Sequence, residues 1–284
     1  MGRPTRTEAI LEAAVSVLEE HHPMTVRQIY YQLVSRQVLE NRRSQYQALS
    51  RLLVGARLEG TIPWRWLEDR TRRPRSVSMW DDLEDFAEAV RRAYRRNVWE
   101  SQPQYLEVWL EKDALSGIFE EVLRKYGVTL NVGRGYDGWD SIHNAAGRFL
   151  GLEGATILYF GDFDPSGEDM VRSLRERLGE LGAKPEIIKC ALTLEDVRRY
   201  NLPPDFTKTT DSRRAGFVAR YGDQSVELDA LPLEVLRERV VTEVEARMDL
   251  DALAEVREVE ERDRELLVQA LSSVSNGGSN GANR

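Results

Sequence analysis

The chain has 284 residues, of which 41% are hydrophobic and 31% are charged, and it contains a single cysteine. This composition excludes wholesale disorder, and the lone Cys190 excludes an internal disulfide and a cysteine-cluster zinc site. The sequence has no apolar run near the ~20 residues that a membrane-spanning helix needs and no apolar signal-peptide core, so we expect a cytoplasmic protein without a membrane partner. The length favours two domains.

The net charge of -8 is unevenly distributed along the chain. Residues 1–76 hold 13 Arg and 8 acidic residues, a net of +5, whereas the remainder holds 27 basic and 40 acidic residues, a net of -13. A basic first part suits an anionic ligand, and an acidic second part suits a metal ion. Chance asymmetry explains these charges equally well, so the distribution alone does not decide between the two.

Two helices are predicted in the first 35 residues. Apolar positions at helical spacing predict the first helix over residues 7–20. Thr25, followed three residues later by Gln28, is a capping-box pattern that opens a second helix through about Ser35. A compact helical start is therefore expected.

A third helix and a basic stretch follow. Ser44 is expected to cap the third helix and Gly60 to end it. The next residues, 61–75, are aromatic and basic together. Three short helices and a basic extended stretch are typical of a winged helix over residues 1–76, with the third helix in the DNA major groove. A generic helical bundle has the same pattern.

Beyond a polar connector helix over about 80–99, within residues 77–104, apolar strand candidates alternate with helices. This alternation predicts βαβ units and a parallel sheet over residues 105–249. Residues 232–270 are charged and helical, and the last segment, 250–284, ends in a flexible tail, SNGGSNGANR. The expected fold is thus α/β: a winged helix, a parallel-sheet domain and C-terminal helices. The expected strands are 105–110, 128–132, 155–160 and 185–192, and the helices between them are 114–125, 140–150 and 166–181.

Carboxylates follow two of the expected strands. Glu111 comes after strand 105–110, and Asp162 and Asp164 come after strand 155–160. Because ligands bind beyond the carboxyl ends of parallel strands, these three acids predict an all-oxygen site suited to Mg²⁺. The glycines of 133–138 would let a ligand approach the backbone closely. Alternatively, residues 162–167 form only a turn into a helix capped by Ser166.

The adjacent tyrosines of RQIYYQL face different directions in a helix. Tyr30 shares the spacing of the buried face, whereas Tyr31 lies about 100° farther round with Arg27, toward a groove or solvent. A phenol has a pKa near 10, so it needs a cation or a base to act as a nucleophile, and Arg27 is placed to help. The more common role of such a tyrosine is a half-buried ring with a hydrogen-bonded hydroxyl. The positions at core spacing are Val26, Ile29, Tyr30, Leu33 and Val34.

Five stretches together resemble a known family. VWLEKDAL, GRGYDG, YFGDFDPSGEDM and VELDAL resemble the Toprim domain of the topoisomerase VI A subunit and of the related meiotic double-strand-break transesterase. RQIYYQL resembles the tyrosine motif of that family's winged-helix domain. The resemblance implies a Mg²⁺-dependent DNA transesterase in which Tyr31, with Arg27, attacks a phosphodiester and forms a 5′-phosphotyrosyl link. It also implies that the metal ligands are Glu111, Asp162 and Asp164.

The resemblance further implies the partners. Double-stranded DNA is the expected substrate, and a homodimer is expected in which the tyrosine of one subunit meets the metal of the other. Topoisomerase VI A subunits act with an ATPase partner, but Tyr31 lies near the chain start, where little room is left to bind such a partner. The arginines expected to hold DNA, each of which alone reads as a solvated surface charge, are Arg42, Arg43, Arg51, Arg57, Arg65, Arg72 and Arg73.

Two other functions fit the same residues. In a hydrolytic Toprim nuclease, metal-activated water attacks the phosphodiester in place of Tyr31. In a DNA-binding module, the acidic site is inactive or structural. The segment ELDAL at 227–231 resembles the family, but its carboxylates have no assigned role beyond dimer or helix-capping contacts.

Overall fold

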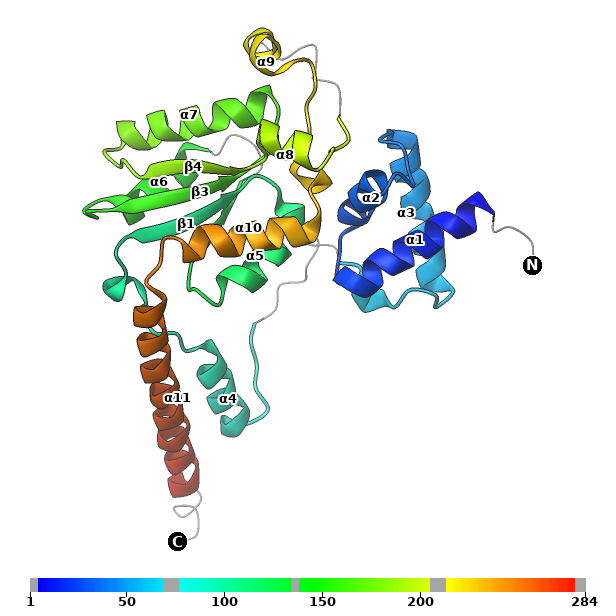
Figure 1. Cartoon of the computed structure of the whole chain (residues 1–284). Helices are drawn as coiled ribbons and strands as arrows, with labels where there is room; N and C mark the ends of the chain where they lie inside the picture. Colours follow the sequence, from blue (N-terminus) through cyan, green and yellow to red (C-terminus); the bar gives the residue numbers. More distant parts are fainter. Residues whose placement is uncertain (1–4, 69–76, 134–137, 205–212, 279–284) are drawn as a thin grey trace. The chain divides into compact units, whose positions relative to one another are not determined.

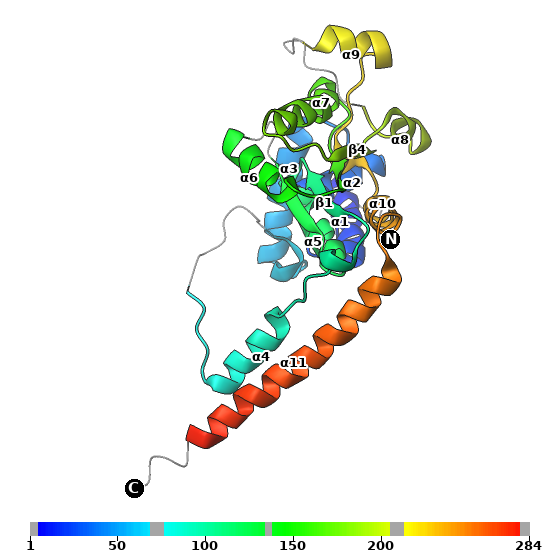
Figure 2. The same ribbon diagram turned by 90° about the vertical axis from the view of Figure 1, so that its left-hand side faces the viewer.

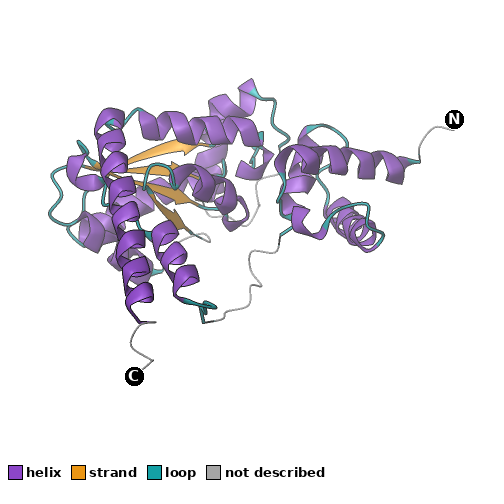
Figure 3. Ribbon diagram, turned by 90° about the horizontal axis from the view of Figure 1, so that it is seen from below, coloured by secondary structure: helices purple, strands orange, loops and turns teal. Residues whose placement is uncertain are grey.

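The computed structural model describes residues 5–68, 77–133, 138–204 and 213–278, with side chains as far as residue 271. In chain order, helices precede and follow the strands of a four-stranded parallel sheet (Figures 1 and 3). This arrangement confirms the expected α/β class, with a helical first part followed by a parallel-sheet region and C-terminal helices. The chain divides into two compact units, one holding the N-terminal helices and Tyr105–Val244 and the other holding helices α4 and α11.

The N-terminal helices begin and end largely where the sequence predicts. They are α1 (Arg6–His21), α2 (Val26–Ser35) and α3 (Arg43–Leu58). The Thr25 and Gln28 capping box is present at the start of α2, and Gly60 follows α3 with a φ of +82°. The expected Ser44 cap is wrong: α3 starts earlier because the Tyr30 hydroxyl accepts a hydrogen bond of 2.7 Å from the Arg42 amide and fixes the backbone there.

The stretch after α3 is only partly described. Residues 61–68 contain a short 3-10 helix, η1 (Trp64–Trp66), and an isolated parallel bridge joins Met24 to Leu67. The rest of the expected basic stretch, residues 69–76, lies outside the described residues. A wing is therefore not visible in the described part of this stretch.

The sheet has the order β2-β1-β3-β4, and every pairing is parallel. β1 and β3 match their predicted ranges because both are buried on two faces and read as continuous apolar runs. Their register pairs Leu110 with Phe160, which brings Glu111 and Gly161 to the same edge of the sheet. The strands are β1 (Tyr105–Leu110), β2 (Thr129–Val132), β3 (Ala155–Phe160) and β4 (Glu186–Ala191).

Helices cover both faces of this sheet (Figure 1). α6 (Trp139–Phe149) and α7 (Pro165–Glu180) pack on one face around a core that includes Trp109, Ile157 and Leu174. α5 (Ser116–Leu123) and α10 (Leu233–Glu245) lie on the other face. Two short helices, α8 (Leu194–Arg199) and α9 (Arg214–Tyr221), follow β4. The carboxyl edge of β1 and β3 is left between these layers.

The second unit is a pair of helices, α4 (Leu83–Ala93) and α11 (Leu250–Gly278), that lie side by side (Figures 1 and 2). α4 is shorter than the expected helix over 80–99 because the Asp82 side chain caps its start at Glu84 and Asp85. α11 continues to Gly278, into the expected tail. No helix in the described parts of the chain combines the length and the apolar content needed to cross a lipid bilayer.

Candidate active site

Glu111 lies where the sequence predicts, directly after β1. Its Oε2 atom accepts hydrogen bonds from the Asp162 amide at 3.0 Å and from the Tyr159 hydroxyl at 3.2 Å. A Cβ atom on Gly161 would come within 2.6 Å of the same oxygen, so the glycine permits this close approach. The structure therefore brings Glu111 together with the loop that carries the two predicted aspartates.

Asp162 is held from two sides. Its Oδ1 atom accepts a hydrogen bond of 2.7 Å from the Leu228 amide and lies 3.2 Å from the Lys112 ammonium. Burial raises the pKa of this carboxyl to about 7, with Glu111 and Glu227 adding to the rise and Lys112 opposing it. Asp162 is thus a desolvated carboxyl in a site with surplus negative charge.

Asp164 has a structural task as well as its predicted position. It is the N-cap of α7, and its Oδ1 atom accepts a hydrogen bond of 2.6 Å from the Gly167 amide. The alternative in which Ser166 caps this helix is wrong, because Pro165 already occupies the first helical position, which proline favours. The cap occupies one of the two carboxylate oxygens of Asp164.

Lys112 lies among these acidic side chains, and the sequence did not predict a role for it. Its ammonium lies 2.9 Å from Glu227, 3.2 Å from Asp162 and 3.9 Å from Asp229. Burial lowers its pKa, but these carboxylates outweigh burial and the pKa is raised, so the side chain is a cation. The only sequence signal was its place after Glu111, at the end of a strand.

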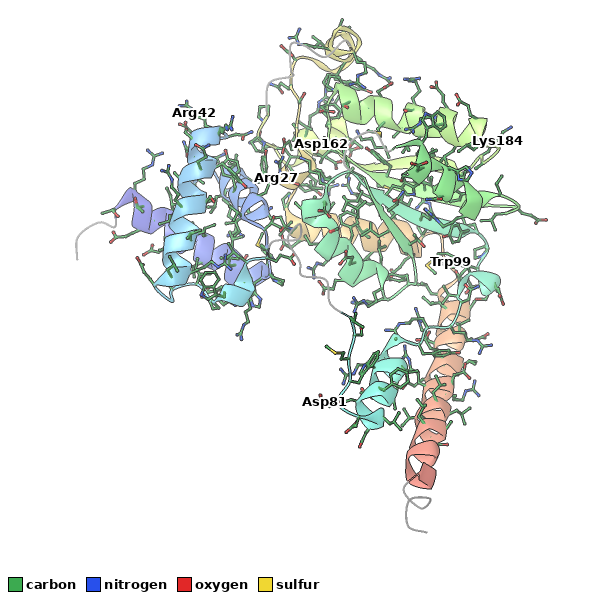
Figure 4. The ribbon with its side chains drawn as sticks, turned by 180° about the vertical axis from the view of Figure 1, so that it is seen from behind. Arg27, Arg42, Asp81, Trp99, Asp162 and Lys184 are labelled. Carbon is green, nitrogen blue, oxygen red and sulfur yellow. The ribbon has the colours of Figure 1, made fainter. Side chains whose placement is uncertain are left out.

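The segment Glu227–Asp229, here called the acidic turn, connects this cluster to the N-terminal helices. Arg27 donates from Nε to Asp229 Oδ2 at 2.7 Å and from Nη2 to Glu227, so α2 lies against the short 3-10 helix η4 (Leu228–Ala230). Arg27 and Asp162, both labelled in Figure 4, contact the acidic turn from α2 and from the loop after β3. The ELDAL carboxylates, left without a role by the sequence, are therefore the partners of Arg27 and Lys112.

The acidic side chains at this edge of the sheet suit a hard divalent cation. They offer carboxylate oxygens, which Mg²⁺ prefers as ligands, and the Oδ1 atom of Asp229 is buried without a hydrogen-bond partner. Within the described residues, however, no group of three His, Cys, Asp or Glu side chains is arranged to hold a metal ion. The Asp162 carboxylate lies 3.2 Å from the Lys112 ammonium, and the Lys189 ammonium donates a hydrogen bond of 2.9 Å to the Asp162 carbonyl.

Tyr31 is more buried than the helical spacing indicated. Its exposed fraction is 7%, against 3% for Tyr30, so both rings are buried. Of the two surroundings expected for Tyr31, a groove or solvent, the structure shows the groove and not solvent, because the acidic turn packs against α2 and Glu227 accepts a hydrogen bond from the phenol. Tyr31 does line a pocket of about 210 Å³ with Arg27, Tyr30, Asn41, Arg43 and Tyr46.

The surroundings of Tyr31 hold its hydroxyl protonated. Burial first, and then the Glu227 carboxylate, raise the pKa of the phenol well above its usual value, and Asp229 adds to this. Arg27, whose Cζ atom lies 5.3 Å from the ring centroid, lowers the pKa but by less. The expected help of Arg27 in ionising Tyr31 is outweighed here, because Arg27 is itself paired with both acids of the turn.

The described members of the predicted DNA-binding set lie in α3, at its N-cap and in η1. Arg43 lines the Tyr31 pocket, whereas Arg42 pairs with Glu40 at 2.9 Å. Arg51 donates a hydrogen bond to a carbonyl of its own helix. The Cζ atom of Arg57 lies 4.1 Å from the centroid of the Trp64 ring, and Arg65 is exposed. Arg72 and Arg73 lie outside the described residues. Of the described set, Arg43 alone shares a pocket with Tyr31.

The chain matches no protein-family profile, and no curated protein is significantly similar to it in sequence. The motifs quoted above are accordingly the whole basis of the resemblance to the topoisomerase VI A family.

Proposed function

We propose that this chain is a Mg²⁺-dependent DNA transesterase of the topoisomerase VI A type, with Tyr31 as its nucleophile. One observation carries the proposal: consecutive contacts run from Tyr31 to Glu227, from Glu227 to Lys112 and from Lys112 to Asp162. A phenol, two basic side chains and a desolvated carboxylate at the carboxyl edge of a parallel sheet are the groups that phosphoryl transfer to tyrosine needs. They come from segments far apart in the sequence.

In the proposed reaction, the Tyr31 hydroxyl oxygen forms a bond to the phosphorus and the bond from phosphorus to the 3′ oxygen breaks. The phenolic proton leaves Tyr31, and the departing 3′ oxygen ends as a hydroxyl. The number of phosphoester bonds is unchanged, so attack by the 3′ hydroxyl on the tyrosyl phosphate rejoins the strand without a nucleotide. Arg27 and Arg43, which line the same pocket as Tyr31, would contact the phosphate oxygens.

Glu111, Asp162 and Asp164 are the residues that would hold Mg²⁺. The bound metal would neutralise charge that develops on the phosphate oxygens. The exposed arginines of α3 would hold the DNA backbone by charge, independently of base sequence. A homodimer fits the proposal, since two such sites cut the two strands, and strand passage would require an ATPase partner in addition.

The test is incubation of the purified chain with supercoiled DNA and Mg²⁺, followed by denaturation with and without protease. The proposal expects protein attached to 5′ ends, and it expects Tyr31→Phe to lose this adduct while the matched Tyr30→Phe variant keeps it. Equal adduct from Tyr31→Phe would reject Tyr31 as the nucleophile. Salt-sensitive DNA binding without any cleavage would favour a binding module with an inactive acidic site.

A hydrolytic nuclease is the second candidate, and one observation favours it: burial and Glu227 keep the Tyr31 phenol protonated. Water activated at the acidic edge would then attack the phosphodiester in place of the phenol. In that case Tyr31→Phe would still cut DNA and leave free ends, whereas Glu111→Ala and Asp162→Ala would not cut. The protease-treated and untreated lanes would look alike for every variant.

A further inference from the structure

The acidic turn offers Arg27 the same kind of partner that DNA would offer. Arg27 binds Asp229 through Nε and Glu227 through Nη2, so two of its donor groups contact carboxylate oxygens. Guanidinium groups bind phosphate oxygens through the same donors. A phosphodiester that binds these two donor groups of Arg27 must therefore displace Glu227 or Asp229.

Glu227 also contacts Tyr31 and Lys112. Its carboxylate accepts a hydrogen bond from the Tyr31 phenol and one of 2.9 Å from the Lys112 ammonium. Asp229 is fully buried and cannot move without unpacking the turn, whereas the Glu227 side chain is 28% exposed. Glu227 is thus the member of the turn that an incoming phosphate can displace.

Resting on the proposed function, we propose that Glu227 is an inhibitory stand-in for the DNA phosphate: it occupies Arg27 and holds the Tyr31 hydroxyl until a phosphodiester displaces it. In this resting arrangement the Tyr31 hydroxyl keeps its proton, donates a hydrogen bond to Glu227 and is not available for attack. Phosphate binding at Arg27 frees the Tyr31 hydroxyl in the same step. Substrate binding and release of the nucleophile are thereby coupled.

The charged groups near Tyr31 predict the direction in which replacing Glu227 shifts the pKa of the phenol. Glu227 and Asp229 disfavour the phenolate, and Arg27 favours it. Replacing Glu227 with glutamine removes one of the two opposing charges and keeps the size of the side chain. The Tyr31 phenolate then becomes more populated at a given pH, by about tenfold for each unit by which the pKa falls.

The experiment measures nitration of Tyr31 by tetranitromethane, a reagent that attacks phenolates, in the full chain without DNA or Mg²⁺. Peptide mass spectrometry separates Tyr31 from Tyr30, and the exposed Tyr46 is an internal reference. The proposal expects Tyr31 to be nitrated about tenfold faster in Glu227→Gln than in the unmodified chain, with Tyr46 unchanged. Glu234→Gln is the matched control, because Glu234 also pairs with an N-terminal helix, through His21, but contacts neither Arg27 nor Tyr31.

Unchanged or slower nitration of Tyr31 in a folded Glu227→Gln chain would overturn the inference. If that variant does not fold, Glu227→Ala gives the same comparison. A second measurement, binding of a short duplex DNA without Mg²⁺, is expected to be tighter for Glu227→Gln than for Glu234→Gln, because Arg27 has lost a competitor. Neither readout requires cleavage, so a chain that forms no covalent adduct would reject the proposed function and leave the nitration result to decide on Glu227.

Discussion

Two buried acidic sites in the same unit differ in how completely their charges are satisfied. Glu107, in the middle of β1, receives two hydrogen bonds from Arg148, at 2.5 and 2.9 Å, one of 2.9 Å from Trp109 and one of 3.0 Å from Tyr105. The acids at the carboxyl edge have surplus negative charge, a raised pKa at Asp162 and an unpartnered oxygen on Asp229. A buried charge with complete partners stabilises the fold, whereas one without them marks a site prepared for a ligand.

Breaking the satisfied site should have the largest effect. Arg148→Met leaves Glu107 buried without its cation, so we expect the free energy of unfolding to fall by about 3 kcal/mol. Urea denaturation at neutral pH measures this. The double variant Glu107→Gln with Arg148→Met should recover most of the loss because no unpaired charge is left. A double variant as unstable as the single one would contradict the assignment of a structural ion pair.

The acidic turn should contribute stability that disappears in acid. Although burial opposes ionisation of Glu227, Lys112 and Arg27 hold its pKa at about 2, below the ordinary value of 4.5. A depressed pKa gives stability that is fully present above about pH 4.5 and is lost as the pH falls toward 2. We expect Glu227→Gln to be less stable than the unmodified chain by about 2 kcal/mol at pH 7 and nearly equal to it only at about pH 2 or below. A difference independent of pH would show that packing is the cause.

Asp162→Asn should have the opposite sign. Burial raises the pKa of Asp162 to about 7 from 3.8, so the unfolded chain loses this proton first and stability falls as the pH rises from about 4 to about 7. Removing the charge should therefore stabilise the chain, by on the order of 1–2 kcal/mol near pH 8, with no gain near pH 4. Thermal unfolding across this range measures it. A destabilised variant near pH 8 would mean that Lys112 more than compensates the burial of Asp162.

Mg²⁺ should act on the unsatisfied site alone, with the smallest effect. A ligand at ten times its dissociation constant adds about 1.4 kcal/mol to the stability of the folded state. We expect MgCl₂ to raise the melting temperature of the unmodified chain near pH 8 by a few degrees, and to raise that of Asp162→Asn much less. NaCl at equal ionic strength is the control. Equal shifts in both proteins would place the cation elsewhere.

The sheet and its edge follow from local patterns in the sequence. β1 and β3 are continuous apolar runs, and the position of Glu111 and Asp162 directly after them was enough to predict that they meet. The carboxyl ends of neighbouring parallel strands lie at the same edge of the sheet, so the residues that follow them come together whatever the rest of the chain does. Asp164 follows β3, as expected. Its role as a helix cap was not predicted, because that role depends on the exact start of α7.

The environment of Tyr31 could not be predicted from local sequence patterns. Helical spacing gives the direction in which a side chain points but not which segment packs there, and Arg27 meets its partners across about two hundred residues of sequence. Lys112 was missed and the acidic turn was left without a role for the same reason, since a charge gains its role from neighbours that are distant in sequence. Burial and the Glu227 carboxylate then outweighed the expected effect of Arg27 on the Tyr31 pKa.

The most direct measurement identifies the residue that becomes joined to DNA. The chain is incubated with end-labelled duplex and Mg²⁺, denatured, and digested with nuclease and protease, and mass spectrometry locates any nucleotide-bearing peptide. The account predicts a peptide modified on Tyr31 and linked through a 5′ phosphate, absent from a parallel Asp162→Asn reaction. A modification on another residue, or DNA cut with every peptide unmodified, would contradict it.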